Sequence, residues 1–281
     1  MITFQTLENT SIDQILETFN LSFSDYIIPF RLTKEQLEEK MKGESIRLEF
    51  SVGAFEEDQL IGFILHGFDL VDNMKVVYNG GTGVIPTKRG SKLTVKMYEY
   101  ILPVLNQNNI DKVLLEVITT NEAAIKTYQN IGFKTMRLLN CFKGSLSQVD
   151  TTGKFEIREM EEYDWPNLYS FWDVKPSWQN SVTAVEKLKT SNVSVGAYEN
   201  GMLLGYAFFN PKIKRIQQLS VNKAYRNRGI GTQLIEYIST KHEKDISIIN
   251  VDDSSIETLK FLNKAGLKIS VKQYEMELTL N

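Results

Sequence analysis

One short segment of the sequence occurs twice in the chain. Residues 51–56 read Ser-Val-Gly-Ala-Phe-Glu, and residues 60–63 continue with Leu-Ile-Gly-Phe. Residues 194–199 read Ser-Val-Gly-Ala-Tyr-Glu, and residues 203–206 continue with Leu-Leu-Gly-Tyr, so the second copy follows the first by 143 residues. In each copy a polar turn separates two short apolar runs, which predicts a β-hairpin. The chain is therefore predicted to hold two copies of one fold.

The order of elements after each hairpin also repeats. In the first half we expect strand 74–85, helix 91–105, strand 112–118, helix 122–131 and a last strand from Phe133. In the second half we expect strand 213–221, helix 231–242, strand 246–251, helix 255–264 and a last strand from Leu267. The helical segments carry apolar residues at a spacing of about 3.6, whereas the strand segments are short and rich in β-branched residues.

Chain length and composition agree with two domains. The 281 residues exceed the usual size of one domain, and 42% apolar with 24% charged residues is typical of globular proteins. Residues 145–153 are polar and lack apolar periodicity, so we place a linker there. The predicted domains are residues 1–146 and 151–281. Each is an α/β (α+β) domain with a mixed, mostly antiparallel twisted sheet flanked by helices.

Composition also argues against several classes of protein. No apolar run is long enough to span a bilayer, and the first residues lack the pattern of a secretory leader. Cys141 is the only cysteine, which excludes an internal disulfide and fits a cytoplasmic protein. A net charge of −3 gives no footprint for nucleic acid. The two histidines, His66 and His242, are far apart, so we expect no metal site.

The most specific signal lies between a predicted strand and a predicted helix of the second half. Residues 226–231 read Arg-Asn-Arg-Gly-Ile-Gly. Glycines let a backbone approach a ligand closely, and a helix N-terminus presents unpaired N–H groups with partial positive charge, so the combination can bind phosphate. A dinucleotide fingerprint would need a glycine where Leu234 stands, and a Walker loop would need Gly-Lys-Ser/Thr. Taken alone, the segment also fits a tight turn without a ligand.

An Arg-x-x-Gly-x-Gly turn after a fourth strand resembles the pyrophosphate loop of the GCN5-related N-acetyltransferase (GNAT) superfamily, which cradles coenzyme A. A second signature lies at residues 121–133, which read Asn-Glu-Ala-Ala-Ile-Lys-Thr-Tyr-Gln-Asn-Ile-Gly-Phe. This segment is similar to the family's fourth-helix pattern, Asn-x-x-Ala-x-x-x-Tyr-x-x-x-Gly-Phe. The resemblance covers nearly the whole chain, once in each half. It implies a tandem GNAT protein that uses acetyl-CoA, with fourth and fifth strands that splay apart to receive the pantetheine arm.

The resemblance also implies which residues serve the site. In the first half the cofactor-binding residues would be Val84, Ile85, Arg89, Gly90, Ser91, Lys92, Leu93, Thr94 and Asn121. In the second half they would be Leu219, Ser220, Val221, Arg226, Asn227, Arg228, Gly229, Ile230, Gly231 and Thr232. Tyr128 would stand near the thioester as general acid, although the same spacing fits a buried helix face. Glu116 is a candidate base, and a solvated strand carboxylate is the alternative.

The two halves depart from the family pattern in complementary ways. Lys92 and Thr94 replace the two motif glycines in the first half, whereas Leu262 stands in the second half at the position that matches Tyr128. The pair Gly80-Gly81 fits either the floor of an acceptor pocket or a strand bulge.

We therefore expect an N-acetyltransferase that transfers an acetyl group from acetyl-CoA to a primary amine of a small molecule or peptide. It would act as a monomer or homodimer, without nucleic-acid or membrane partners. The alternatives are a non-catalytic acyl-CoA-binding sensor or scaffold, and an acyltransferase that uses another acyl-CoA. The sequence does not identify the acceptor, the half in which turnover occurs, or the general base.

Overall fold

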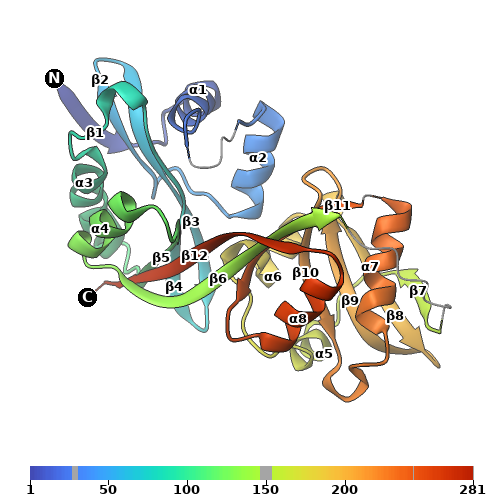
Figure 1. Ribbon diagram of the computed structural model, residues 1–281. Helices are drawn as coiled ribbons and strands as arrows, with labels where there is room; N and C mark the ends of the chain where they lie inside the picture. Colours follow the sequence, from blue (N-terminus) through green and yellow to red (C-terminus); the bar gives the residue numbers. More distant parts are fainter. Residues whose placement is uncertain (27–30, 146–153, 243, 281) are drawn as a thin grey trace. The chain divides into compact units, whose positions relative to one another are not determined.

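The computed structural model describes residues 1–26, 31–145, 154–242 and 244–280 (Figure 1). The chain divides into two compact units. Unit 1 is Met1–Met136 together with Tyr274–Asn281, and unit 2 is Arg137–Gln273. No helix in these described ranges is long and apolar enough to cross a membrane.

Unit 1 has an antiparallel sheet that ends in a parallel pair. Its antiparallel neighbours are, in order, β1 (Ile2–Thr6), β2 (Val52–Glu56), β3 (Gln59–Val71) and β4 (Met74–Val84). Strand β4 then pairs in parallel with β5 (Lys112–Ile118). The helices are α1 (Ile12–Ser22), α2 (Lys34–Gly43), α3 (Leu93–Gln107) and α4 (Glu122–Ile131), with a short 3₁₀ turn η1 (Pro86–Lys88). One apolar cluster joins the sheet to α3 and α4, and another joins it to α1 and α2.

Unit 2 repeats this arrangement. Its antiparallel neighbours are β7 (Glu156–Glu159), β8 (Val193–Glu199), β9 (Met202–Asn210) and β10 (Arg215–Val221), and β10 pairs in parallel with β11 (Asp245–Asp252). The helices are α5 (Trp165–Ser170), α6 (Val182–Lys187), α7 (Ile230–Lys241) and α8 (Ile256–Lys264). In the part of this unit that the structure describes, the 3₁₀ turns are η2 (Trp178–Asn180), η3 (Lys189–Ser191) and η4 (Lys223–Tyr225). The core between α7 and the sheet is apolar, as is the cluster that joins α5 and α6 to β9.

Each unit takes a strand from the other half of the sequence. Strand β6 (Lys134–Ser145) follows the first repeat, yet its residues 139–145 pair antiparallel with β11 in unit 2. Strand β12 (Lys268–Thr279) returns its last residues to unit 1, next to β5. There the Nζ of Lys112 lies 2.9 Å from an Oε of Glu277. An internal repeat reveals that a last strand exists in each half, but it does not reveal which sheet edge that strand joins.

The domain boundaries taken from the repeat differ from this division by contacts. The predicted domains 1–146 and 151–281 would leave all of β6 in the first domain and all of β12 in the second, whereas unit 2 begins at Arg137 and ends at Gln273. Of the predicted linker at 145–153, Ser145 is the last residue of β6 and residues 146–153 lie outside the described residues. The two predicted domains therefore stay a prediction about where the chain can be cut.

The structure confirms the predicted fold class and most element positions. Strand 112–118 and helix 122–131 have the predicted bounds, and both repeated hairpins form. The hairpin turns use left-handed residues, with φ of 56° at Glu57 and 51° at Asn200, which suits the twist of paired strands. The fourth and fifth strands of each half splay, since parallel pairing covers residues 76–79 of β4 and only 215–216 of β10.

Candidate functional site

The turn after β10 has a backbone suited to an anion. Turn η4 ends before Asn227 and Gly229, which both adopt left-handed conformations with φ of 63° and 90°, and α7 begins at Ile230. A Cβ at Gly229 would meet no atom within 4 Å. Glycine is therefore favoured here because of the left-handed backbone conformation and not because a side chain would clash. The N–H groups of the first turn of α7 have no partner within the helix and carry its partial positive charge. Backbone and helix end together form a place for phosphate oxygens.

The equivalent turn of unit 1 keeps this backbone despite its different sequence. Gly90 has φ of 78° and Lys92 has φ of 59°, so left-handed residues again alternate before a helix, α3, which begins at Leu93. Lys92 thus takes the left-handed conformation that Gly229 has in unit 2. Of the other predicted residues, Ser91 donates a hydrogen bond to the carbonyl oxygen of Lys88, and Thr94 lies in the first turn of α3.

Unit 2 has a cavity of about 640 Å³ where β10 and β11 separate. Its lining includes residues 217–221 of β10, 248–252 of β11, and 172–176 after α5. Residues of the turn and of α7 and α8, together with Asn180 and Tyr206, also line it. Of the predicted cofactor-binding residues, the lining includes Leu219, Ser220, Val221, Arg226, Asn227, Gly229, Ile230, Gly231 and Thr232. The structure therefore brings the predicted second-half residues together around one space.

Arg228 differs from these neighbours. Its guanidinium pairs with the Glu199 carboxylate at 2.6 Å, and both side chains are partly exposed. This ion pair and the cation–π contact with the Tyr225 ring hold Arg228 outside the cavity lining.

A bulge marks the point at which β10 leaves β11. Ile216 pairs with Phe209 and Gln218 with Phe208, so Gln217 is an extra residue on β10. In unit 1, β4 has an extra residue at the matching place, since Asn79 pairs with His66 and Gly81 with Leu65. The bulge interpretation of the Gly80-Gly81 pair is thus confirmed. A bulge breaks the ladder of backbone hydrogen bonds, and a freed N–H group can then donate to a substrate oxygen.

Polar side chains form the floor of the unit 2 cavity. Trp172 donates from Nε1 to the Tyr206 hydroxyl at 2.5 Å, and that hydroxyl donates to Gln218 at 2.9 Å. The side-chain Nε2 of Gln218 in turn donates a hydrogen bond to the carbonyl oxygen of Asn180 at 2.6 Å. Burial raises the pKa of the Tyr206 hydroxyl, so this chain of hydrogen bonds is neutral at physiological pH. Sequence reasoning missed these residues, although a Gln-Gln pair inside an apolar strand was a usable signal.

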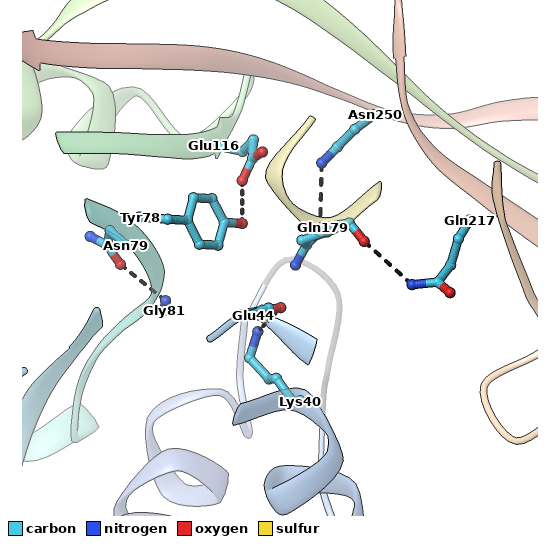
Figure 2. A network of polar contacts seen from close by, with 9 residues as sticks. All are labelled: Lys40, Glu44, Tyr78, Asn79, Gly81, Glu116, Gln179, Gln217 and Asn250. Atoms are coloured by element: carbon cyan, nitrogen blue, oxygen red, sulfur yellow. Dashed lines mark hydrogen bonds and ion pairs between the residues drawn. The ribbon is translucent and has the colours of Figure 1, made fainter. Parts of the chain in front are cut away.

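A second set of amides lies behind this floor. Gln217 and Asn250 both reach Gln179 in Figure 2, at 3.4 and 3.5 Å respectively. Asn250 also accepts a hydrogen bond from Gln273 at 2.8 Å. These contacts fix Gln217 and Asn250, which come from the two strands that splay apart.

Tyr128, the predicted general acid, lies on α4 in unit 1 and is 8% exposed. Burial raises the pKa of its hydroxyl, which hydrogen-bonds to Thr82 and Asn79 on β4. Its ring packs edge-on against Tyr98 and Phe133. The structure thus shows Tyr128 as part of the apolar core with a hydroxyl held by β4, and its role as an acid stays a prediction.

Asn121 and Glu116, two further predicted first-half residues, also have partners within unit 1. The Oδ1 of Asn121 caps α4 by accepting from the N–H of Ala124, and its Nδ2 donates to the Tyr26 hydroxyl, both at 3.2 Å. Glu116 accepts a hydrogen bond from the Tyr78 hydroxyl (Figure 2). Burial first, and the Glu116 charge second, raise the pKa of Tyr78. Val84 ends β4 and Ile85 follows it at the start of η1.

Comparison with known proteins identifies what this arrangement is similar to. The model of the acetyltransferase (GNAT) family matches residues 12–133 and 157–267. A search of curated proteins finds no match in sequence.

Solved structures share the fold along the whole chain at low identity. A tandem GNAT protein from the clavulanic acid biosynthesis pathway is 12% identical, with a TM-score of 0.75, and the match covers 100% of this chain and 99% of that one. A GCN5-related N-acetyltransferase from Sphaerobacter thermophilus is 12% identical, with a TM-score of 0.72 and coverage of 100% and 96%. A glucosamine N-acetyltransferase region of a fungal multi-domain beta-N-acetylglucosaminidase is 15% identical, with a TM-score of 0.73 and coverage of 99% and 38%.

Proposed function

The chain belongs to the acetyltransferase (GNAT) family, and from this membership we propose that it transfers an acetyl group from acetyl-CoA to a primary amine, with the coenzyme bound in unit 2. The observation that carries the proposal is the cavity of about 640 Å³ between the splayed strands β10 and β11, whose lining includes all residues of the turn at 226–232 except Arg228. The acceptor would be a small molecule or a peptide. Cys141 is the one cysteine of the sequence and has no second cysteine with which to form an internal disulfide, which supports a location in the reducing cytoplasm.

The residues present fit two parts of coenzyme A, its pyrophosphate and its pantetheine arm. The left-handed turn at Asn227 and Gly229 and the N-terminus of α7 provide N–H donors for the pyrophosphate. Among the described residues the parallel pairing of β10 with β11 ends at Ile216, so the β10 backbone from Leu219 to Val221 can hydrogen-bond to the pantetheine amides, with the pantetheine arm in the place of a further strand. The cavity volume also lies within the range usual for cofactor sites.

Acetyl-CoA supplies an activated acetyl thioester, and the chain then has two tasks. The first is to stabilise the negative oxygen that develops when an amine attacks the carbonyl, and the bulge at Gln217 offers a backbone donor for it. The second is to accept the proton that an alkylamine must lose, because its pKa is near 10. A thiol has a pKa of only about 8.5, so a thiolate leaves without a strong acid. Leu262 in place of a tyrosine is therefore compatible with turnover.

Leu262 also supports a second candidate function, that of a protein that binds acyl-CoA without turnover. Leu262 is 1% exposed and cannot donate a proton, so unit 2 would also suit an acyl-CoA-binding sensor or scaffold without turnover. An acyltransferase that uses another acyl-CoA shares this site and is the third candidate.

A thiol-release assay separates these functions. The full chain is mixed with acetyl-CoA and a panel of primary amines, including amino sugars, polyamines and peptides with a free α-amine. Release of free coenzyme A that depends on one of the amines supports the transferase. Tight binding of acetyl-CoA by calorimetry without release from any amine would instead favour the sensor, and release from longer acyl-CoA alone would favour the third candidate.

A further inference from the structure

Arg226 is the first residue of the turn at residues 226–232, which we call the coenzyme turn. Its side chain nevertheless hydrogen-bonds to protein groups of unit 2. Its Nε donates to the carbonyl oxygen of Val221 at 3.2 Å, and one terminal nitrogen donates to the carbonyl oxygen of Phe171 at 2.9 Å. The other terminal nitrogen lies 2.8 Å from a carboxylate oxygen of Asp173. All three nitrogens of the guanidinium therefore have a protein acceptor, and two of those acceptors belong to the segment that follows α5.

Arg89 makes the same set of contacts in unit 1. Its Nε donates to Val84 at 3.3 Å, and its terminal nitrogens reach the carbonyl oxygen of Ser22, at 2.9 Å, and the Asp25 carboxylate, at 2.7 Å. Ser22 is the last residue of α1, and Phe171 directly follows α5. Each arginine therefore connects the turn after the fourth strand of its unit to the C-terminal end of an equivalent helix. The pairing lowers the pKa of Asp25, mainly through the hydrogen bond from Arg89. The geometry recurs although the two halves differ in the rest of the turn.

The segment that Arg226 holds is a wall of the cavity. Residues 172–176 line it, and Trp172 donates to the hydroxyl of Tyr206 on its floor. Ser220, on β10, adds a further hydrogen bond to the carbonyl oxygen of Phe171 at 3.1 Å. Arg226 thus connects the end of β10 and the start of the coenzyme turn to the wall formed by residues 172–176.

We propose that Arg226 is a positioning residue that fastens this wall to the coenzyme turn, and that it does not serve as a phosphate ligand. The inference rests on the proposed function for the identity of the turn, while the fastening itself is a property of the free protein. A planar guanidinium can serve three acceptors at fixed angles, whereas a lysine ammonium cannot reproduce that fork. The coenzyme phosphates would then be held by backbone N–H groups of the turn and of α7.

The test compares Arg226→Lys with Arg226→Gln in the full chain. Lys keeps the charge and loses the fork, whereas Gln loses both. If Arg226 fastens the wall, backbone amides of residues 171–175 exchange hydrogen about tenfold faster in both variants than in the wild type, because a local opening becomes easier. Affinity for coenzyme A, measured by calorimetry, is then equal in the two variants within about threefold, since the arginine charge does not contact phosphate.

Two results would overturn the proposal. One is unchanged exchange at residues 171–175 in either variant. The other is coenzyme affinity retained by Arg226→Lys and lost by Arg226→Gln, which would indicate a phosphate contact. Because exchange is measured without coenzyme, it remains decisive even if the chain binds no coenzyme A, in which case the proposed function fails separately.

Matched variants keep the result interpretable. Arg89→Lys makes the same change in unit 1 and should leave exchange at residues 171–175 at the wild-type rate. Asp173→Asn keeps Arg226 and its carbonyl contacts, so if the arginine variants fail to fold, faster exchange in Asp173→Asn supports the fastening and unchanged exchange refutes it.

Discussion

The turn at Gly229 offers the sharpest test of where coenzyme binds, through the substitution Gly229→Glu. Gly229 is exposed and has φ of 90°, and a Cβ there would meet no atom within 4 Å. The new side chain therefore fits, but it carries backbone strain of about 1–2 kcal/mol, the usual cost of the left-handed conformation for an L-residue. Gly229→Gln has the same strain and nearly the same size without the charge, so it is the matched control.

The expected loss of affinity follows from Coulomb's law. Two like charges about 4 Å apart repel by about 1 kcal/mol in bulk water and about 4 kcal/mol at an effective dielectric constant of about 20. The turn is exposed, so the lower part of this range applies, about 1–2 kcal/mol. Since about 1.4 kcal/mol changes a dissociation constant tenfold, Gly229→Glu should bind coenzyme A about 5-fold to 30-fold more weakly than Gly229→Gln.

Calorimetry with coenzyme A on both variants measures this difference. Repeating the titration at about 0.5 M salt should shrink the gap between Glu and Gln, because screening weakens interactions between exposed charges. Thermal unfolding should show equal stability for the two variants within about 0.5 kcal/mol, as for exposed substitutions in general. Equal affinity for coenzyme A in Glu and Gln at low salt would refute the assignment of the turn.

Further predictions concern unit 1 and the connection between the halves. Burial lowers the pKa of His66 to about 4 in the folded protein, compared with about 6.5 in the unfolded chain. Below about pH 6.5 the unfolded chain therefore binds more protons than the folded protein. The free energy of unfolding should then fall by about 2 kcal/mol from pH 7 to pH 5. In denaturant unfolding, the free energy of unfolding of His66→Gln should fall less over this pH range than that of the wild type. An identical fall would show that His66 is not its cause. Tyr128→Phe removes a hydroxyl held by Thr82 and Asn79, so it should cost about 1–2 kcal/mol of stability while keeping kcat within about threefold. A loss of about 10²-fold in kcat with coenzyme affinity intact would instead place turnover in unit 1, with Tyr128 as its acid. Limited proteolysis should cut first between Ser145 and Gly153, but the nicked halves should elute together because β6 pairs with β11. Elution as separate halves would argue against the strand exchange.

Much of the fold could be predicted because local patterns specify it. The repeated hairpin, the apolar spacing of the helices and the glycine turn each depend on neighbouring residues, and each was found where it was expected. The exchange of β6 and β12 could not be predicted in this way. Strand pairing is a long-range choice, and the segment after Phe133 is equally a strand whichever sheet edge it joins.

The candidate site was predictable to the extent that it is built from backbone. Residues of the turn and of β10 line the cavity as the resemblance implied, because a local sequence sets a local backbone. Side-chain partners were not predictable. Asp173 forms an ion pair with Arg226, and the hydroxyl of Tyr206 accepts a hydrogen bond from Trp172. In both pairs the two residues lie far apart in the sequence. Lys92 shows the reverse case, since a residue that departs from the motif still adopts the left-handed conformation.

A crystal structure of the full chain with acetyl-CoA would show directly which unit binds the coenzyme. We expect pyrophosphate density on the backbone N–H groups between Asn227 and Thr232, with the pantetheine arm along β10 from Leu219 to Val221. Density for the coenzyme along β4 in unit 1, with none between β10 and β11, would rule out the proposed site in unit 2.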